Sequence, residues 1–476
     1  MNSEPLYLAD GKSFNVRAFG AKGNGIADDT QAIQAAINAA LGYSGVGAPC
    51  VLIPAGQYRI NMHLGNTDCA VGRLVLGASQ GSGRVHIRGE GSATLSTSVD
   101  AWPDGQLDFL LAIWSQSFSD VLIENLRFQR TLSTPPALIG PTQQTVAIAS
   151  MATRTTIRNC TFIDFPQTLY FVKADAPLVT GCRWIHTDGI ACGRGGAVGG
   201  YPNVGLRCDN CTDVQIDNNI WRGTENMSGS TASIPMDGFV WGTSRGWTIR
   251  GNVVRRAFVE GIYCVQNGNG DPASSAIIEG NTVDCDYPAS LDPALVRKGI
   301  RMAIRADDWN ANIRGNRIAK ARSPISVNNL VAPGPVGGII SNNQITFDIF
   351  DTSVVNAAGS VLFGIALQNR SAMLVDANQI LFPAGSIGNA AINLPTAGVT
   401  LTNCSSITIT ENMVWAPDSA TPPNSDLWAM YLSGINDGLI TRNVISNMGK
   451  DVGKAPGAGG TLQITANTLF QTPQAS

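Results

Sequence analysis

Short runs of alternating apolar and polar residues fill most of the chain, and one six-residue pattern recurs among them. It reads apolar, any residue, small or polar, Asn, any residue, apolar. Clear copies begin at Ile216, Ile249, Ile278, Ile313, Ile340, Val375, Ile409, Ile440 and Ile464, and weaker copies begin at Ile123, Ile157 and Val179. Their spacing varies from 22 to 37 residues. A repeat of this length predicts a solenoid in which each copy belongs to one coil.

The fourth position of the pattern predicts a ladder of side chains inside the solenoid. It is occupied by Asn219, Asn252, Asn281, Asn316, Asn343, Asn378, Asn412, Asn443 and Asn467. Stacked strands lie about 4.8 Å apart, so equivalent amides on neighbouring coils can hydrogen-bond to each other. Cys160 and Cys182 occupy the same position in the weaker copies, which suggests buried thiols.

The N-terminal segment predicts one helix followed by a buried strand. Ile33, Ile37 and Leu41 form one apolar face, and Gly42 is a stop signal. Asp28 or Asp29 can accept hydrogen bonds from the free N–H groups at the helix start, so we interpret both as structural. The apolar run at 51–53 then predicts a strand.

Residues 14–60, with the sequence FNVRAFGAKGNG, the Asp28-Asp29-Thr30 step, the helix and VLIPAGQYRI, resemble the N-terminal signature of the pectate-lyase-like superfamily. Members include polygalacturonase-type hydrolases, alginate epimerases, β-1,3-glucanases and phage tailspike depolymerases. The resemblance implies an all-β chain, a right-handed parallel β-helix with an N-terminal capping α-helix. Residues 1–60 would then be the cap segment and residues 61–476 the body. It also implies a polysaccharide as the partner.

Composition excludes several function classes. The net charge is −3 without a basic stripe, so we expect no nucleic acid. No apolar run reaches about 18 residues, so we expect no membrane span. The start lacks a signal-peptide pattern. We expect an extracellular protein, either a mature secreted form or a virion component, with a cytoplasmic location as the alternative. The ten Cys do not suggest a disulfide framework in a chain of this length.

A second pattern, Gly followed by an apolar residue, precedes most copies of the repeat and predicts a second strand column. The glycines are Gly205, Gly238, Gly261, Gly299 and Gly364. Alternation along these strands predicts four outward residues stacked on one face: Arg207, Val240, Tyr263 and Arg301. By the same alternation, Trp241 should face inward together with Cys208.

Asp237 and Glu260 each precede a glycine of this pattern, on consecutive coils. We expect their carboxyl groups to lie about 5 Å apart, at the coil spacing. Two carboxyl groups this close have divergent pKa values, which makes one an acid and the other a base or nucleophile. The pair therefore predicts an endo-acting glycoside hydrolase, although a carboxylate before Gly also often caps a turn.

Loops before and after these strands are expected to wall a cleft and to bring substrate-binding residues to it. Cations suit acidic groups on a glycan, and aromatic rings stack on sugars. The candidates are Arg207, Lys298, Arg305, Trp221, Trp309, His186 and Asp188. Loop packing, turns and Arg–Asp pairs are the simpler interpretations of several of them.

Two other functions stay open. In a polysaccharide lyase, Tyr263 would move the proton while Arg301 and Lys298 neutralise a uronate carboxylate. A non-catalytic glycan-binding tailspike or adhesin would bind without turnover. The epimerase motif Tyr-Gly-Phe-Asp-Pro-His is absent, since the matching stretches read DGFVW and EGIYC. The resemblance therefore implies fold and substrate class but not mechanism.

We expect no cofactor and no catalytic transition metal. The three His have no Cys or His at ligand spacing. A Ca²⁺ site that includes Asp284 and Asp286 stays possible. The sequence leaves the sugar, its linkage and a bacterial or phage origin open, and it allows a monomer or a homotrimer.

Overall fold

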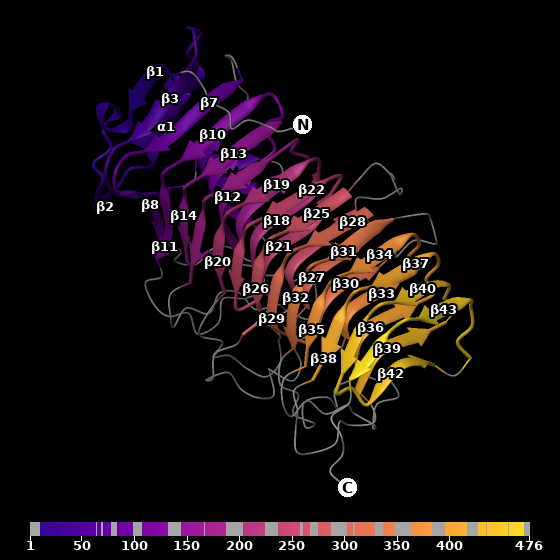
Figure 1. Cartoon of the computed structure of the whole chain (residues 1–476). Helices are drawn as coiled ribbons and strands as arrows, with labels where there is room; N and C mark the ends of the chain where they lie inside the picture. Colours follow the sequence, from indigo (N-terminus) through magenta and orange to yellow (C-terminus); the bar gives the residue numbers. More distant parts are fainter. Residues whose placement is uncertain are drawn as a thin grey trace. The chain divides into compact units, whose positions relative to one another are not determined.

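The structure is a computed structural model of the 476-residue chain. It describes residues 10–62, 64–67, 70–77, 83–98, 107–131, 144–165, 167–186, 203–223, 237–257, 260–266, 275–286, 302–307, 310–328, 337–347, 363–382, 396–416, 427–434, 436–455 and 457–470. The chain divides into two compact units, Met1–Arg245 and Gly246–Ser476. Each unit consists of strands that form three sheets, which we call A, B and C (Figure 1).

In the first unit the strands repeat in the order A, B, C along the chain. Sheet A contains β1 (Asp10–Asn15), β3 (Ala48–Ile53), β7 (Arg84–Gly89), β10 (Asp120–Glu124), β13 (Arg154–Arg158), β16 (Leu178–Thr180) and β19 (Val214–Asp217). Sheet B contains β2 (Asn24–Asp28), β4 (Gly56–Arg59), β8 (Ala93–Ser98), β11 (Arg127–Thr131), β14 (Thr161–Ile163), β17 (Arg183–Ile185) and β20 (Ile220–Arg222). Sheet C contains β5 (Gly65–Thr67), β6 (Ala70–Leu76), β9 (Leu107–Ile113), β12 (Gln144–Ser150), β15 (Gln167–Val172), β18 (Asn203–Cys211) and β21 (Asp237–Ser244).

The second unit repeats the same order. Sheet A contains β22 (Trp247–Arg250), β25 (Ser275–Glu279), β28 (Asn310–Arg314), β31 (Gly338–Ser341), β34 (Met373–Asp376), β37 (Ile407–Thr410), β40 (Gly438–Thr441) and β43 (Leu462–Thr465). Sheet B contains β23 (Val253–Arg255), β26 (Thr282–Asp284), β29 (Arg317–Ala321), β32 (Gln344–Phe347), β35 (Gln379–Leu381), β38 (Met413–Trp415), β41 (Val444–Ser446) and β44 (Thr468–Phe470). Sheet C contains β24 (Glu260–Gln266), β27 (Met302–Asp307), β30 (Ser323–Asn328), β33 (Phe363–Gln368), β36 (Thr396–Thr402), β39 (Leu427–Ser433) and β42 (Lys450–Lys454).

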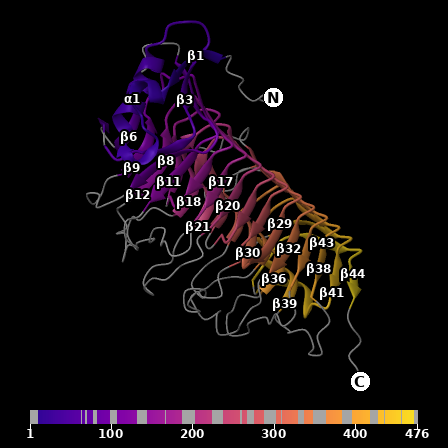
Figure 2. The ribbon, with the colours of Figure 1, turned by 90° about the vertical axis from the view of Figure 1, so that its left-hand side faces the viewer.

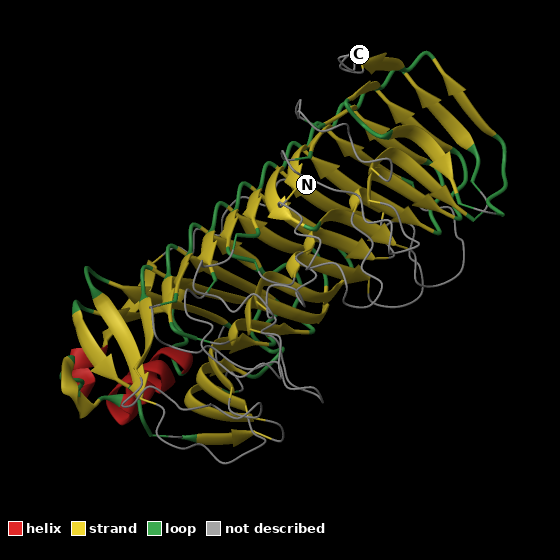
Figure 3. Cartoon of the chain, turned by 90° about the horizontal axis from the view of Figure 1, so that it is seen from below, coloured by secondary structure: helices red, strands yellow, loops and turns green. Residues whose placement is uncertain are grey.

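The strand pairs that carry the coils are parallel, as β10 with β13 and β25 with β28 illustrate, and only the β5–β6 hairpin is antiparallel among the described pairs. Three parallel sheets that are visited in turn by successive coils make a right-handed parallel β-helix, which confirms the predicted fold. Figure 3 shows how strands dominate the described residues.

The core is built from equivalent apolar side chains stacked on successive coils. In the first unit the Phe128 and Phe162 rings lie 5.3 Å apart, and Phe162 and Trp184 lie 5.2 Å apart. In the second unit one equivalent position of sheet A holds a buried aliphatic side chain on seven successive coils: Ile249, Ile278, Ile313, Ile340, Val375, Ile409 and Ile440. The eight cysteines among the described residues are buried and form no disulfide with one another, including Cys160 and Cys182, as expected for interior thiols.

The predicted Asn ladder is present in the second unit. From Asn252 to Asn443, each Asn donates its backbone N–H and its Nδ2–H to Oδ1 of the Asn on the following coil, ending at Asn467, over 2.9–3.1 Å. In the first unit Asn219 Oδ1 accepts from the Cys182 N–H at 2.8 Å. The ladder satisfies backbone groups that turn away from the sheets.

The first unit begins with a 3₁₀ turn, η1 (Val16–Phe19), and the helix α1 (Thr30–Leu41), whose buried face includes Ile33, Ala36 and Ile37. The helix packs against β1 and β3 (Figure 2). Asp28 Oδ1 accepts from the Thr30 N–H, and Asp29 accepts from Lys22 and Gly23 at 2.6 and 3.0 Å. Both carboxylates are engaged in local structure.

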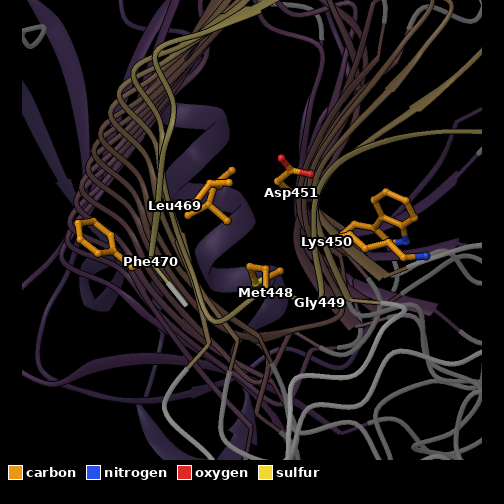
Figure 4. Close-up of a pocket in the computed structure, with 8 residues that line it drawn as sticks. Met448, Gly449, Lys450, Asp451, Leu469 and Phe470 are labelled. Carbon is orange, nitrogen blue, oxygen red and sulfur yellow. The ribbon is translucent and has the colours of Figure 1, made fainter. Parts of the chain in front are cut away.

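The last described coil of the second unit has nothing packed over it among the described residues. Ile464 pairs with the buried Ile440 and Leu469 with the buried Ile445, yet their exposed fractions are 45% and 51%. A cavity of 330 Å³ opens there, lined by Trp428, Ile445, Met448, Gly449, Lys450, Asp451, Leu469 and Phe470. Leu469 and Met448 point into the space between the strands, whereas Phe470 points away (Figure 4). Within the described part of the chain, no helix is long and apolar enough to cross a membrane.

Candidate functional site

Polar side chains gather on the outer face of sheet C in the second unit, where β24 and β27 lie side by side. In this register Glu260 pairs with Met302, Ile262 with Ile304, and Tyr263 with Arg305. Two strands one coil apart therefore bring Glu260, Tyr263 and Arg305 together. The expectation that Arg301 stacks on Tyr263 is wrong, because Arg305 takes that position.

The physical reason for this shift is that the position beside Gly261 on the next coil requires a small residue, which can be alanine as well as glycine. A Cβ at Gly261 would lie 2.7 Å from the carbonyl oxygen of Ala303, so the backbones approach closely here. On the next coil Ala303, and not Gly299, lies beside Gly261. A glycine is therefore an unreliable marker of the register.

Arg305 is the centre of this group. Its Nη1 donates to Glu260 Oε1 at 3.1 Å, and its Nη2 lies 2.8 Å from Asp307 Oδ2. Its guanidinium carbon also lies 4.5 Å from the ring centroid of Tyr263. Glu260 and Arg305 keep 12% and 24% of their side chains exposed, whereas Asp307 is fully buried. Only the first two are available to a ligand.

Asp307 fixes both of its neighbours. Besides pairing with Arg305, its Oδ2 accepts a hydrogen bond from the Tyr263 hydroxyl at 3.1 Å. A fully buried carboxylate needs such partners, because an unpaired charge is costly to desolvate. We call Glu260, Tyr263, Arg305 and Asp307 the Glu260 cluster.

Burial shifts the ionisation of this cluster. It raises the pKa of Glu260, and although Arg305 opposes this effect, Asp307 adds to it. Burial and the Asp307 charge also raise the pKa of the Tyr263 hydroxyl, which stays protonated at neutral pH. Burial lowers the pKa of Arg305, but Asp307, Tyr263 and Glu260 together outweigh this effect, so that the pKa is raised too. A carboxyl group with a raised pKa beside a fixed cation is suited to proton donation.

The first unit holds another cation on the outer face of sheet C. Arg207 donates from Nε and Nη2 to the two carboxylate oxygens of Asp209, over 3.1 and 2.8 Å. It lies between two rings, 5.1 Å from the Tyr170 centroid and 4.9 Å from that of Trp241. Predicted to bind acidic groups of a substrate, Arg207 is already neutralised by Asp209.

Alternation was predicted incorrectly on β21. Val240 pairs with the buried Leu206 and is itself fully buried, while Trp241 pairs with Arg207 and is half-buried. Gly238 lies beside Val204 and not beside Gly205, so the strand is offset by one residue from the predicted register. Val240 therefore faces inward and Trp241 outward, the reverse of the expectation.

Comparison with known proteins agrees with this architecture. Residues 13–168 match the family model described as rhamnogalacturonase A/epimerase, pectate lyase-like. This part of the chain is therefore similar to the pectate-lyase-like family. The resemblance predicted from residues 14–60 is thereby confirmed over a longer segment.

Two curated relatives of this chain come from Azotobacter vinelandii. Mannuronan C5-epimerase AlgE1 is 34% identical over 114 residues, which cover 24% of this chain and 7% of that protein. Alginate lyase 7 is 39% identical over 92 residues, covering 19% and 10%. Among solved structures, the tailspike protein of E. coli bacteriophage HK620 has a TM-score of 0.48 at 12% identity and covers 94% of this chain and 78% of its own. The chain thus matches only a small part of its curated relatives.

Two further predicted residues, Trp221 and His186, lie in the first unit. The prediction that Trp221 stacks on a sugar is wrong. The residue is buried, with 1% of its surface exposed. His186 packs its ring edge-on to Trp221 at 6.2 Å. Desolvation lowers the pKa of His186 to about 4, so the imidazole is neutral at neutral pH.

The remaining predicted residues fall partly or wholly outside the described residues. Asp237 begins β21, but its side chain is outside them. Arg301, Lys298, Trp309 and Asp188 lie outside them entirely.

Metal ligands are not clustered in the described part of the chain, where no group of three or more His, Cys, Asp or Glu side chains is arranged to hold an ion. Asp286 pairs with Lys320 at 2.8 Å, and Asp284 Oδ1 accepts from the Asp286 N–H at 3.0 Å. The carboxylates proposed for Ca²⁺ are therefore engaged in local contacts.

The Arg–Asp pair expected after Arg305 is confirmed by the contact between Arg305 and Asp307, whereas sequence reasoning missed Asp209 as the partner of Arg207. Each follows its Arg by two residues, as Arg305-Ala-Asp307 and Arg207-Cys-Asp209. Residues two apart on a strand share a face. This Arg-x-Asp spacing within a strand was the signal that identifies them.

Proposed function

We propose that this chain cleaves a polysaccharide as an endo-acting glycoside hydrolase, with Glu260 as the proton donor. The observation that carries the proposal is the state of the Glu260 carboxyl group. It is partly exposed on sheet C, its pKa is raised, and one oxygen is held by Arg305 at 3.1 Å.

Glu260 has the geometry of a general acid. Arg305 engages Oε1, while Oε2 makes no hydrogen bond to any described residue. A proton on Oε2 can pass to the glycosidic oxygen of a bound glycan as its bond to the anomeric carbon breaks. Arg305 then stabilises the carboxylate that remains.

The second carboxylate of the proposed reaction is Asp237. It would attack the anomeric carbon or activate a water molecule, and its distance from Glu260 would decide the stereochemical outcome. Asp307 is a poor substitute, because it is fully buried and holds Arg305 and Tyr263. Asp237 precedes Gly238 as Glu260 precedes Gly261, and this shared position is the reason for pairing them.

The relatives support a polysaccharide as the substrate class. The curated matches include a mannuronan epimerase and an alginate lyase, whose names refer to polysaccharides. A polysaccharide substrate is consistent with our proposal of an extracellular enzyme, either secreted or virion-associated.

Elimination is the second candidate, and the Tyr263–Arg305 contact favours it. A phenol stacked on a guanidinium can donate a proton while the cation holds a uronate carboxylate. The raised pKa of Tyr263 suits a proton donor and disfavours the hydroxyl as a base. Hydrolysis is preferred because Glu260 supplies an acid of more suitable pKa.

The test compares Glu260→Gln, Asp237→Asn and Tyr263→Phe with Glu279→Gln, a control on sheet A whose side chain is 44% exposed. Products from a panel of bacterial and algal polysaccharides are followed as new reducing ends and as ultraviolet absorbance, with thermal melts for each variant. Glu260→Gln should lose about 10²-fold or more in rate, while Glu279→Gln keeps it.

Three outcomes would contradict hydrolysis by Glu260. Ultraviolet-absorbing products from the wild type would indicate elimination. Binding of a glycan without any product would indicate a glycan-binding protein. A near-normal rate in Glu260→Gln, with an unchanged melting temperature, would place the chemistry elsewhere.

A further inference from the structure

The first unit contains a second copy of the Glu260 cluster. Its members are Gln167, Tyr170, Arg207 and Asp209, which we call the Gln167 cluster. Tyr170 pairs with Arg207 as Tyr263 pairs with Arg305. Asp209 follows Arg207 by two residues, as Asp307 follows Arg305, and Gln167 precedes Tyr170 by three residues, as Glu260 precedes Tyr263.

The contacts repeat along with the register. The Tyr170 hydroxyl donates to Asp209 Oδ2 at 2.8 Å, and the Tyr263 hydroxyl donates to Asp307 Oδ2 at 3.1 Å. Arg207 Nη2 lies 2.8 Å from Asp209 Oδ2, the same distance as in the Arg305–Asp307 pair. Each guanidinium also lies over the ring of its Tyr. Four positions and three contacts therefore recur in two separate units.

The copies differ in the group that does the proposed chemistry. Gln167 has nearly the shape of a glutamate side chain but cannot ionise or donate an acidic proton. Arg207 is neutralised by both oxygens of Asp209, and the half-buried Trp241 ring covers it. The Gln167 cluster thus keeps the frame and lacks the acid.

Gln167 supplies an independent indication of a ligand. It is 1% exposed, and its Nε2 has no hydrogen-bond partner among the described residues. A buried amide without a partner is destabilising, and native proteins rarely keep one without a reason.

We infer that the Gln167 cluster is a second glycan-binding site, which holds a neutral, hydroxyl-rich segment of the polysaccharide without cleaving it. The inference rests on the proposed function, because it assigns to this site the substrate class of the Glu260 cluster. The neutralised Arg207 favours hydroxyl groups over a carboxylate. Tyr170 and Trp241 contribute apolar ring surface beside them.

The experiment measures binding stoichiometry in the non-cleaving Glu260→Gln background. Immobilised oligosaccharide fragments of bacterial and algal polysaccharides identify a binding probe, and isothermal titration then counts the fragments bound per chain. Two equivalents are expected. Adding Gln167→Leu should reduce this to one, while Gln215→Leu, on sheet A of the same unit, should leave two.

Stability separates a binding role from a structural one. Replacing an unpaired buried amide by an apolar side chain of similar size should leave the melting temperature unchanged or raise it. Loss of one equivalent together with an undiminished melting temperature supports the site. If Gln167→Leu fails to fold, Trp241→Ala tests the same loss of one equivalent from a half-buried position.

A single equivalent that neither substitution affects would overturn the inference, as would the absence of binding by every fragment. These results differ from a failure of the proposed function. Retained turnover in Glu260→Gln would refute the role of Glu260. One equivalent per chain, in a Glu260→Gln variant without turnover, would refute only the second site.

Discussion

Replacing a central rung of the Asn ladder should be among the most destabilising single changes in the second unit. Asn316 is buried, and its side chain makes four hydrogen bonds. Its Oδ1 accepts from the backbone N–H and the Nδ2–H of Asn281 at 2.9 and 3.0 Å. Its Nδ2 donates to the Ile278 carbonyl oxygen at 2.9 Å and to Asn343 Oδ1 at 3.0 Å.

The magnitude follows from the groups that Asn316→Ala leaves without partners. Asn281 loses the acceptor for its buried backbone N–H, and Ile278 loses a donor to its carbonyl oxygen. A buried group left unpaired costs about 1–3 kcal/mol. With two such groups and two weakened amides, we expect a loss of about 3–6 kcal/mol in the free energy of unfolding.

Asn467→Ala is the matched control, because it removes the same side chain from the last rung. That side chain accepts two bonds from Asn443, at 2.9 and 3.0 Å, in a partly exposed setting. Water can replace it, so we expect a loss of about 1 kcal/mol or less.

The assay is urea unfolding followed by far-ultraviolet circular dichroism, with unfolding rates as well as midpoints, because a repeat protein of this length need not unfold in one step. Hydrogen exchange at residues 275–286 reports the Asn281 amide directly. Equal midpoint shifts for Asn316→Ala and Asn467→Ala would refute the reasoning, since the cost would then not come from orphaned buried groups.

Three further predictions concern ionisable groups. Asp307→Asn removes a charge that helps to raise the pKa of Glu260, so the high-pH limb of the kcat/KM profile should move to lower pH; an unmoved limb would argue against Glu260 as the acid. Burial alone would raise the pKa of Glu124, but Arg158 and His86 together outweigh it, and the pKa lies below its ordinary 4.5. Its stabilising effect is therefore present above that value and lost as the pH falls through the lowered pKa, and melting temperatures of Glu124→Gln should show a shallower acid slope than the wild type. Burial raises the pKa of the Cys160 thiol far above its usual range, so mass spectrometry should find it unmodified by iodoacetamide in the native protein and modified in urea.

The ladder was predictable from sequence because one physical requirement repeats on every coil. Asn252 and Asn443 both lie where the chain leaves sheet A, at a position where a buried amide satisfies backbone groups. Sequence spacing between coils does not matter for this, since the pattern itself marks the position. Nine copies in phase therefore sufficed to predict it.

The candidate site was predicted less well, because its register depends on loop lengths that no repeat constrains. Gly299 fitted the glycine pattern, yet Ala303 takes the position beside Gly261, and Arg305 replaces Arg301 at Tyr263. Close backbone approach asks only for a small residue there. A sequence pattern therefore cannot distinguish the alignment of Gly261 with Gly299 from its alignment with Ala303, four residues later.

Because of the same ladder, the chain can gain or lose length in steps of one whole coil. Each rung joins the donor of one coil to the acceptor of the next, and all coils from Asn252 to Asn443 present the same pair of groups. Duplicating or deleting a whole coil therefore leaves every other rung and every apolar stack complete. A change of one residue within a strand instead turns the inward side chains outward. Evolution can thus lengthen such a chain coil by coil, and can copy an outer-face cluster with its coil and change it later, as Gln167 differs from Glu260.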